Sequence, residues 1–219
     1  VRDFAPVTLA DRSPNVLVVH PSLPVKNVRE LIALAKAHPG QLNYASGSAG
    51  ASPHLSAELF NAMAQVNIVR INYKGTGPVM PDLMAGRIDV TAAGLLASLP
   101  QVKSGKVRAI AVTGSHRDPN LPDVPTFTEA GLKDADVDSI WGLHAPAGTP
   151  ADIRRQLRDA VVEVLNAPDL APKLVERGYE VIGNVIKSAG QAIHCWRHSS
   201  KGVVADNLRI FDNTGKPVV

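Results

Sequence analysis

Serine and glycine residues crowd into one short stretch, residues 45–52, between an apolar segment and a helix-like run. Where a strand turns into a helix, the first backbone N–H groups of the helix have no partner within it, and the helix dipole favours negative charge there. The serines add hydroxyl donors, and the glycines let a ligand approach the backbone closely. The stretch therefore predicts capture of a small anion, most simply a carboxylate. The expected ligand-binding residues are Ser46, Gly47, Ser48, Ala49, Gly50 and Ser52.

A second small-residue turn, residues 73–77, follows another strongly apolar segment. Lys74 carries a point charge suited to a carboxylate, and Thr76 adds a hydroxyl. Two interpretations stay open: this turn forms a second side of the same site, or it is an ordinary strand-to-helix turn with an exposed lysine. Lys74 and Thr76 join the expected ligand-binding residues under the first interpretation.

Residue types that could support catalysis or bind a metal are few. His54 could hydrogen-bond a ligand, cap its helix or pack, and the sequence places no triad partner near it. His194, Cys195 and His198 fall within five residues, but the chain has one cysteine and no second cluster of ligands. We therefore expect no catalytic residue, no metal and no cofactor, which argues against an enzyme.

Apolar strand-like segments alternate with helix-like segments along most of the chain, and the strands are continuously apolar. This pattern predicts a buried, mostly parallel α/β sheet. Asn27, with Glu30 three residues later, is the expected N-cap of the first helix. The expected strands are 14–20, 42–45, 66–73, 88–93, 107–113 and 179–182, a further strand begins at 141, and the expected helices are 28–37, 52–64, 79–85, 96–104, a short one after Thr126, one from Pro150 and 168–177.

The charge and hydropathy of the chain exclude some classes of partner. The 219 residues carry a net charge of +3, and the basic residues are scattered rather than clustered, so we expect no nucleic-acid partner. No apolar run reaches the roughly 18 residues of a membrane span. No signal peptide is visible, and the chain opens with Val1 rather than Met, so we expect it to be a processed or partial product.

Six motifs follow one another along the chain, at residues 3–8, 15–19, 39–46, 73–76, 121–126 and 145–150. Together they resemble one family, the periplasmic solute-binding proteins of tripartite tricarboxylate transporters, called Bug or TctC-like receptors. The resemblance covers nearly all of residues 2–184. It implies a two-lobed α/β fold of the periplasmic-binding-protein type (type II flytrap), a small carboxylate as ligand and membrane transporter subunits as partners. It also implies that the turn at 45–52 is one of the family's two ligand-gripping turns.

Against the family pattern, this chain starts after the first half-lobe. We therefore expect residues 12–134 to form a nearly complete ligand-binding lobe, and residues 1–11 and 135–219 to be a partial remnant of the other lobe. Residues 185–200 depart from the family, which suggests a frameshifted stretch between matching flanks.

Three functional hypotheses remain open from the sequence. The first is a periplasmic, exported solute-binding protein that captures a small carboxylate. The second is a degenerate paralogue without binding function that folds as a homo-oligomer, because a remnant lobe would expose apolar surfaces. The third is a small α/β enzyme acting on carboxylates, with His54 as its base.

Overall fold

The structure is a computed structural model that describes residues 3–132, 135, 137–176 and 180–181. The chain divides into two compact units. The larger unit comprises Arg12–Ser139 and Lys173–Glu180, and the smaller comprises Val1–Asp11, Ile140–Pro172 and Val181–Val219. That residues 12–134 and the remaining segments correspond to the two lobes of the family stays a prediction.

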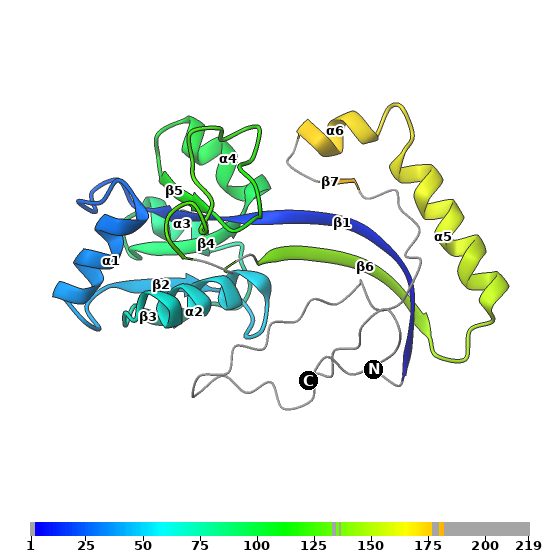
Figure 1. Ribbon diagram of the computed structural model, residues 1–219, viewed down its shortest axis with the longest axis horizontal. Helices are drawn as coiled ribbons and strands as arrows, with labels where there is room; N and C mark the ends of the chain where they lie inside the picture. Colours follow the sequence, from blue (N-terminus) through cyan, green and yellow to red (C-terminus); the bar gives the residue numbers. More distant parts are fainter. Residues whose placement is uncertain (1–2, 133–134, 136, 177–179, 182–219) are drawn as a thin grey trace. The chain divides into compact units, whose positions relative to one another are not determined.

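A twisted sheet forms the centre of the larger unit, with strand order β3-β2-β4-β1-β5 (Figure 1). β2 is parallel to β3 and to β4, whereas β1 is antiparallel to β4 and β5. Four strands therefore run in one direction, as expected for a mostly parallel sheet, and β1 runs against them. β1 also pairs with β6 and β7. The strands are β1 Phe4–Val19, β2 Asn43–Ser46, β3 Val69–Asn72, β4 Val90–Gly94, β5 Arg108–Val112, β6 Asp138–Pro146 and β7 Glu180–Val181.

Helices cover both faces of this sheet. Leu17 and Val19 of β1 belong to a buried cluster with α1 and α2, while Val16 and Val18 belong to a second cluster with α3 and α4. Successive strand residues point to opposite faces, so a run of apolar residues in β1 supplies both cores. The helices are α1 Val28–Ala37, α2 Ser52–Ala64, α3 Val79–Met84 and α4 Leu95–Lys103.

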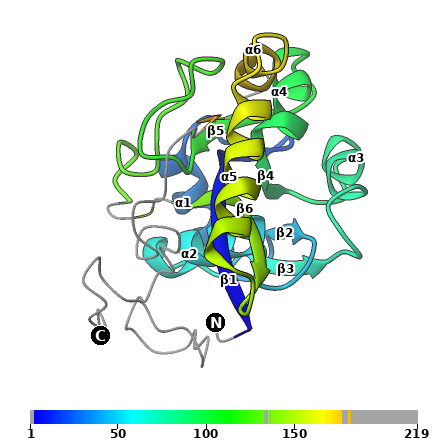
Figure 2. The ribbon, with the colours of Figure 1, turned by 90° about the vertical axis from the view of Figure 1, so that its right-hand side faces the viewer.

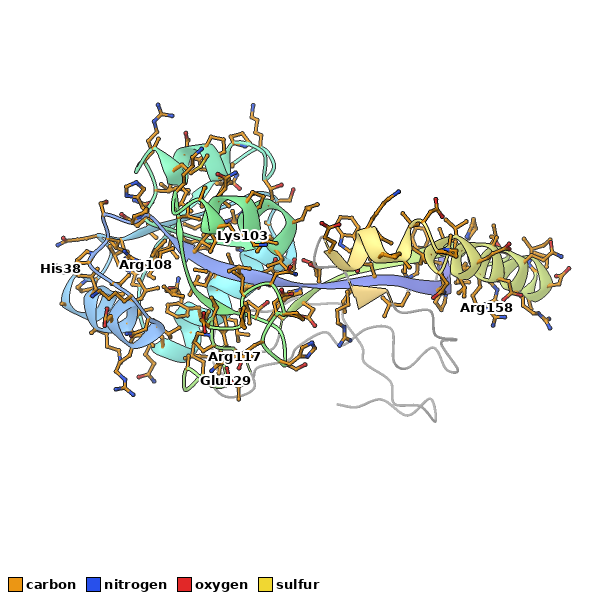
Figure 3. The ribbon with its side chains drawn as sticks, turned by 90° about the horizontal axis from the view of Figure 1, so that it is seen from above. His38, Lys103, Arg108, Arg117, Glu129 and Arg158 are labelled. Atoms are coloured by element: carbon orange, nitrogen blue, oxygen red, sulfur yellow. The ribbon has the colours of Figure 1, made fainter. Side chains whose placement is uncertain are left out.

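Local sequence signals explain where these elements begin and end. Asn27 caps α1 as predicted: its Oδ1 accepts the Glu30 amide at 2.9 Å, and its Nδ2 donates to Glu30 Oε1 at 2.8 Å. The short helix predicted after Thr126 is instead a hydrogen-bonded turn. The Glu129 carboxylate accepts hydrogen bonds from the Thr126 amide and from the Arg117 guanidinium. The side chains of Arg117 and Glu129 lie together in Figure 3.

The smaller unit contains most of β6 and the helix α5, Ala151–Leu165. The Ala147 amide donates to the carbonyl of Asp3 at 3.1 Å, which fixes the end of β6 beside the start of β1. Within the described part of the chain, α5 has no buried residue. On its apolar face Ile153, Leu157 and Val164 are exposed, and Val161 and Leu165 are half-buried. Large apolar side chains of this unit are accessible, with exposed fractions of 63% at Trp141, 41% at Ile153, 42% at Leu157 and 58% at Val164.

Candidate functional site

The turn between β2 and α2 is the centre of the candidate site. Ser46 is the last residue of β2 and Ser52 the first of α2, so the predicted residues lie on the strand-to-helix connection. Ser46 and Gly47 are buried, whereas Ser48, Ala49 and Gly50 are exposed. Gly50 has φ +82°, a left-handed conformation that favours glycine. The Ala51 amide donates to the Ser48 carbonyl at 3.3 Å and closes the turn.

The N-terminus of α2 has backbone donors available. Its N-cap, Ala51, is in an extended conformation and makes no side-chain cap bond, and no acidic residue stands in the first turn. Among the residues that the structure describes, none accepts a hydrogen bond from the amides of Ser48, Ala49 or Ser52. Because these donors lie at or just before the positive end of the helix dipole, the arrangement suits an anion.

Arg70 lies beneath this turn and was missed by the sequence reasoning. Parallel pairing of β2 with β3 aligns Arg70 with Tyr44 and Asn72 with Ser46, and Figure 2 shows these two strands side by side. Arg70 Nε donates to Ser46 Oγ at 2.7 Å, and its Nη2 donates to the Gly47 carbonyl at 2.8 Å. The only sequence signal was an arginine near the end of a strand, and the register that makes it relevant is a tertiary feature.

The second predicted turn, between β3 and α3, lies against the first. A Cβ added to Gly47 would lie 3.0 Å from the carbonyl carbon of Gly75 and 3.2 Å from the Thr76 amide nitrogen. The structure thus brings the two turns together at the carboxyl ends of adjacent parallel strands, the usual ligand position in α/β sheets. Lys74 and Thr76 are both exposed in this turn. Among the described residues, neither side chain makes a hydrogen bond or an ion pair with the first turn.

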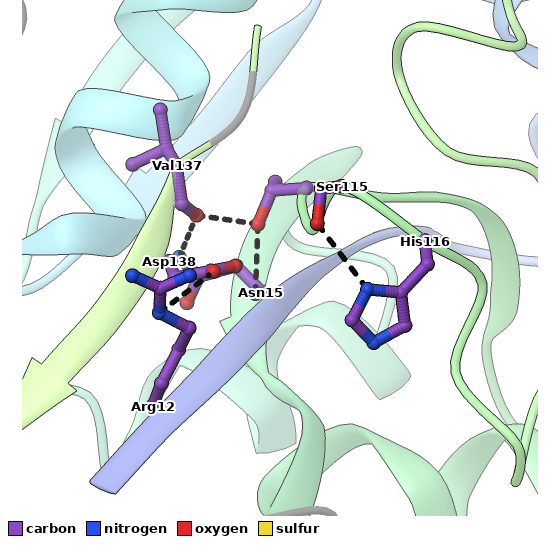
Figure 4. Close-up of polar contacts among 7 residues, drawn as sticks. Arg12, Asn15, Ser115, His116, Val137 and Asp138 are labelled. Carbon is purple, nitrogen blue, oxygen red and sulfur yellow. Dashed lines mark hydrogen bonds and ion pairs between the residues drawn. The ribbon is translucent and has the colours of Figure 1, made fainter. Parts of the chain in front are cut away.

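Ser52 connects the site to the start of β6. Its Oγ lies 2.5 Å from Ser139 Oγ, so this hydroxyl already has a protein partner. Nearby, Asn15 Nδ2 donates to Ser56 Oγ at 3.2 Å and to the Val137 carbonyl at 3.5 Å. Figure 4 shows Asn15 and Val137 beside the ion pair of Arg12 with Asp138, at 3.5 Å. A buried polar network thus supports the first turn of α2.

His54 is arranged as a structural group. Its Nδ1 accepts the Gly50 amide at 3.1 Å, which fixes the loop against α2. Burial lowers the pKa of His54, and the positive charge of Arg70 lowers it further, against the opposing effect of Glu58. The neutral imidazole is therefore favoured. Glu58 itself accepts the Tyr44 hydroxyl, and the pKa of Tyr44 is raised, chiefly by burial.

Within the described ranges, no group of three or more His, Cys, Asp or Glu residues is placed to hold a metal ion. His194, Cys195, His198 and the divergent segment 185–200 lie outside the described residues. Across the helices that the structure describes, none has the length and apolar character needed to cross a bilayer.

Comparison with known proteins identifies the family. The family model described as "Tripartite tricarboxylate transporter family receptor" (TctC) matches residues 1–198. A UPF0065 protein from the tcbD-tcbE intergenic region of Pseudomonas sp. (strain P51) is 36% identical over 183 residues, covering 83% of this chain and 54% of that protein. Protein BugT of Bordetella pertussis is 32% identical over 178 residues, covering 81% of this chain and 55% of that protein. The chain thus spans about half the length of these curated relatives.

Solved structures agree. R. palustris Rpa4515, solved with adipate, is 40% identical with a TM-score of 0.75, covering 82% of this chain and 60% of that one. MatC from Rhodopseudomonas palustris, with bound malate, is 34% identical with a TM-score of 0.76, covering 81% of this chain and 60% of that one. The periplasmic binding protein BugD is 32% identical with a TM-score of 0.76, covering 82% of this chain and 60% of that one. These matches confirm the predicted periplasmic-binding-protein fold, and the chain belongs to the tripartite tricarboxylate transporter receptor family of solute-binding proteins.

Proposed function

We propose that this chain captures a small carboxylate in the periplasm and presents it to the membrane subunits of a tripartite tricarboxylate transporter. The carrying observation is the uncapped N-terminus of α2, where the amides of Ser48, Ala49 and Ser52 have no acceptor among the described residues. The family match and two relatives solved with adipate and with malate favour a carboxylate over other anions. On this proposal the chain binds and releases its ligand without catalysis or a cofactor.

In this proposal the two turns make different contacts with the ligand. Exposed backbone donors at Ser48 and Ala49 hydrogen-bond a carboxylate oxygen, and the Ser48 hydroxyl adds a further donor. Lys74 and Thr76 contribute charge and a hydroxyl from the second turn, which contacts Gly47 through its backbone. Ser46 and Ser52 act differently, because their hydroxyls are bound to Arg70 and Ser139; they hold the turn in the shape that binding requires.

Isothermal titration calorimetry of the purified chain tests the proposal. Malate and adipate are the probes, and their uncharged diamides are the matched controls. Binding of at least one dicarboxylate, with no heat from its diamide, supports carboxylate capture. Absence of binding by both acids, or equal binding by the diamides, contradicts it.

Self-association is the second candidate, and one observation favours it. Trp141 of β6 and Ile153, Leu157 and Val164 of α5 are exposed in the smaller unit. Large exposed apolar side chains are common at interfaces between protein chains. Light scattering coupled to size exclusion distinguishes the cases: a concentration-dependent dimer supports association, and a mass of 23.2 kDa at all concentrations contradicts it.

A further inference from the structure

The three hydrogen bonds of Arg70 converge on the ends of β2 and β3. Besides Ser46 and Gly47, its Nη2 donates to Asn72 Oδ1 at 2.9 Å. We propose that Arg70 is the positioning residue of the carboxylate site, because it fixes the direction of the Ser48 amide N–H. This inference rests on the proposed function for its consequence on binding, although the orientation of the amide is measurable without a ligand.

Peptide geometry carries the argument from Arg70 to Ser48. In a trans peptide the carbonyl and the following N–H point in opposite directions, and no cis peptide is present in the described backbone. The Gly47 carbonyl points to Arg70, so the Ser48 N–H points away from Arg70. Ser48 is exposed, and its amide has no acceptor among the described residues. The N–H is thereby held ready for an external acceptor.

Because residue 47 is glycine, the orientation of the Gly47–Ser48 peptide depends on the hydrogen bond from Arg70. A glycine peptide has more backbone freedom than any other, so the Gly47–Ser48 plane can rotate at low cost unless something anchors it. The Gly47 carbonyl is anchored by Arg70 at 2.8 Å. The close approach of Gly75 disfavours a larger residue at position 47, whose backbone would be less free.

The fork shape of the guanidinium matters as well as its charge. Arg70 reaches Ser46 Oγ through Nε and the Gly47 carbonyl through Nη2, two acceptors on consecutive residues. A lysine ammonium is a point charge on a flexible stem and does not present donors in a fixed planar arrangement. Lysine at this position therefore keeps the positive charge near the site and loses the geometry, which separates positioning from a simple electrostatic field.

Four proteins test the inference: wild type, Arg70→Lys, Arg70→Ala and the control Asn72→Ala, which removes the third bond of Arg70 without touching the first turn. The Ser48 amide is followed in ¹H–¹⁵N spectra without ligand, and malate and adipate affinities are measured by calorimetry. We expect the Ser48 amide signal to move in Arg70→Lys and the affinity to fall about tenfold or more, the usual value of a hydrogen bond to a charged group. Asn72→Ala should retain the wild-type affinity within about twofold, which is less than the change expected from the loss of one hydrogen bond to a charged group.

Chemical rescue guards against general misfolding. Millimolar ethylguanidinium added to Arg70→Ala restores part of the lost affinity, and ethylammonium at the same concentration does not. An unchanged Ser48 signal in Arg70→Lys, or full malate and adipate affinity in that variant, overturns the inference. A wild-type chain that binds neither acid while its Ser48 signal responds to Arg70→Lys contradicts the proposed function and supports the positioning of Ser48 by Arg70.

Discussion

The carbonyl carbon of Gly75 lies 3.0 Å from the position that a Cβ on Gly47 would occupy. These two glycines belong to different strand-to-helix turns, and their backbones are in contact because β2 and β3 are adjacent and parallel. A side chain at position 47 would therefore have to push the backbone of the second turn away by a few tenths of an ångström. The relationship joins the two predicted turns into one surface and makes Gly47 a packing requirement of the site.

Gly47→Ala is expected to destabilise the protein by about 1–3 kcal/mol, the usual cost of forcing an extra methyl into close-packed atoms. The affinity for malate and adipate should fall with it, because the turns must move apart. Gly77→Ala is the matched control, since an added Cβ there meets no atom within 4 Å. Urea unfolding measures both variants, and equal stability of the two contradicts the tight contact at Gly47.

Much of the fold could be predicted from the sequence. The boundaries of α1 and α2 match the expected helices, and the Asn27 cap is confirmed, because amphipathic spacing and capping residues are local signals. The reversed direction of β1 was not predicted, since a continuous apolar run looks the same whichever way its neighbours run.

The candidate site was predictable only in part. Both turns could be read from their small residues, and their contact follows from strand order. Arg70 and Ser139 were missed, because their roles come from register and from a contact across 87 residues of chain, and neither leaves a local pattern. The ligand roles of Ser46, Gly47, Ser48, Ala49, Gly50, Ser52, Lys74 and Thr76 stay predictions.

Two serine substitutions test the first turn directly. Ser46→Ala removes an acceptor of Arg70, and Ser48→Ala removes an exposed hydroxyl donor. Each should weaken carboxylate binding by about 1–3 kcal/mol, the range for a lost hydrogen bond involving a charged group. Ser104→Ala, at the exposed end of α4, is the control and should bind as wild type. Unchanged affinity in both test variants, measured by calorimetry, removes this turn from the site.

Asn15 is expected to be important for stability. Its side chain is fully buried and donates to Ser56 Oγ and to the Val137 carbonyl. Figure 4 shows Asn15 beside Val137. Asn15→Ala leaves buried polar partners without their bond and should cost about 1–3 kcal/mol in the free energy of unfolding. Asn166→Ala, at an exposed helix end, should change stability by no more than about 0.5 kcal/mol. Similar midpoints for the two variants in urea would argue against the network.

His54 gives the stability a defined pH dependence. Its pKa in the folded protein lies below the ordinary value of 6.5, chiefly because of burial, so the unfolded chain takes up a proton first as the pH falls. The contribution of neutral His54 is fully present above about pH 6.5 and is lost progressively below it, down to the folded pKa. In His54→Gln the melting temperature should fall less steeply between pH 6.5 and 5. Identical slopes in wild type and variant would contradict the assignment.

The most direct test of the central claim is a map of backbone amide shifts during titration of the ¹⁵N-labelled wild-type chain with malate and with adipate. We predict the largest saturable changes at Ser48, Ala49 and Ser52, with smaller ones at Thr76. Changes centred elsewhere, for example on Leu96, Leu99 and Lys103, which line a separate hollow beside α4, would contradict carboxylate capture at the N-terminus of α2.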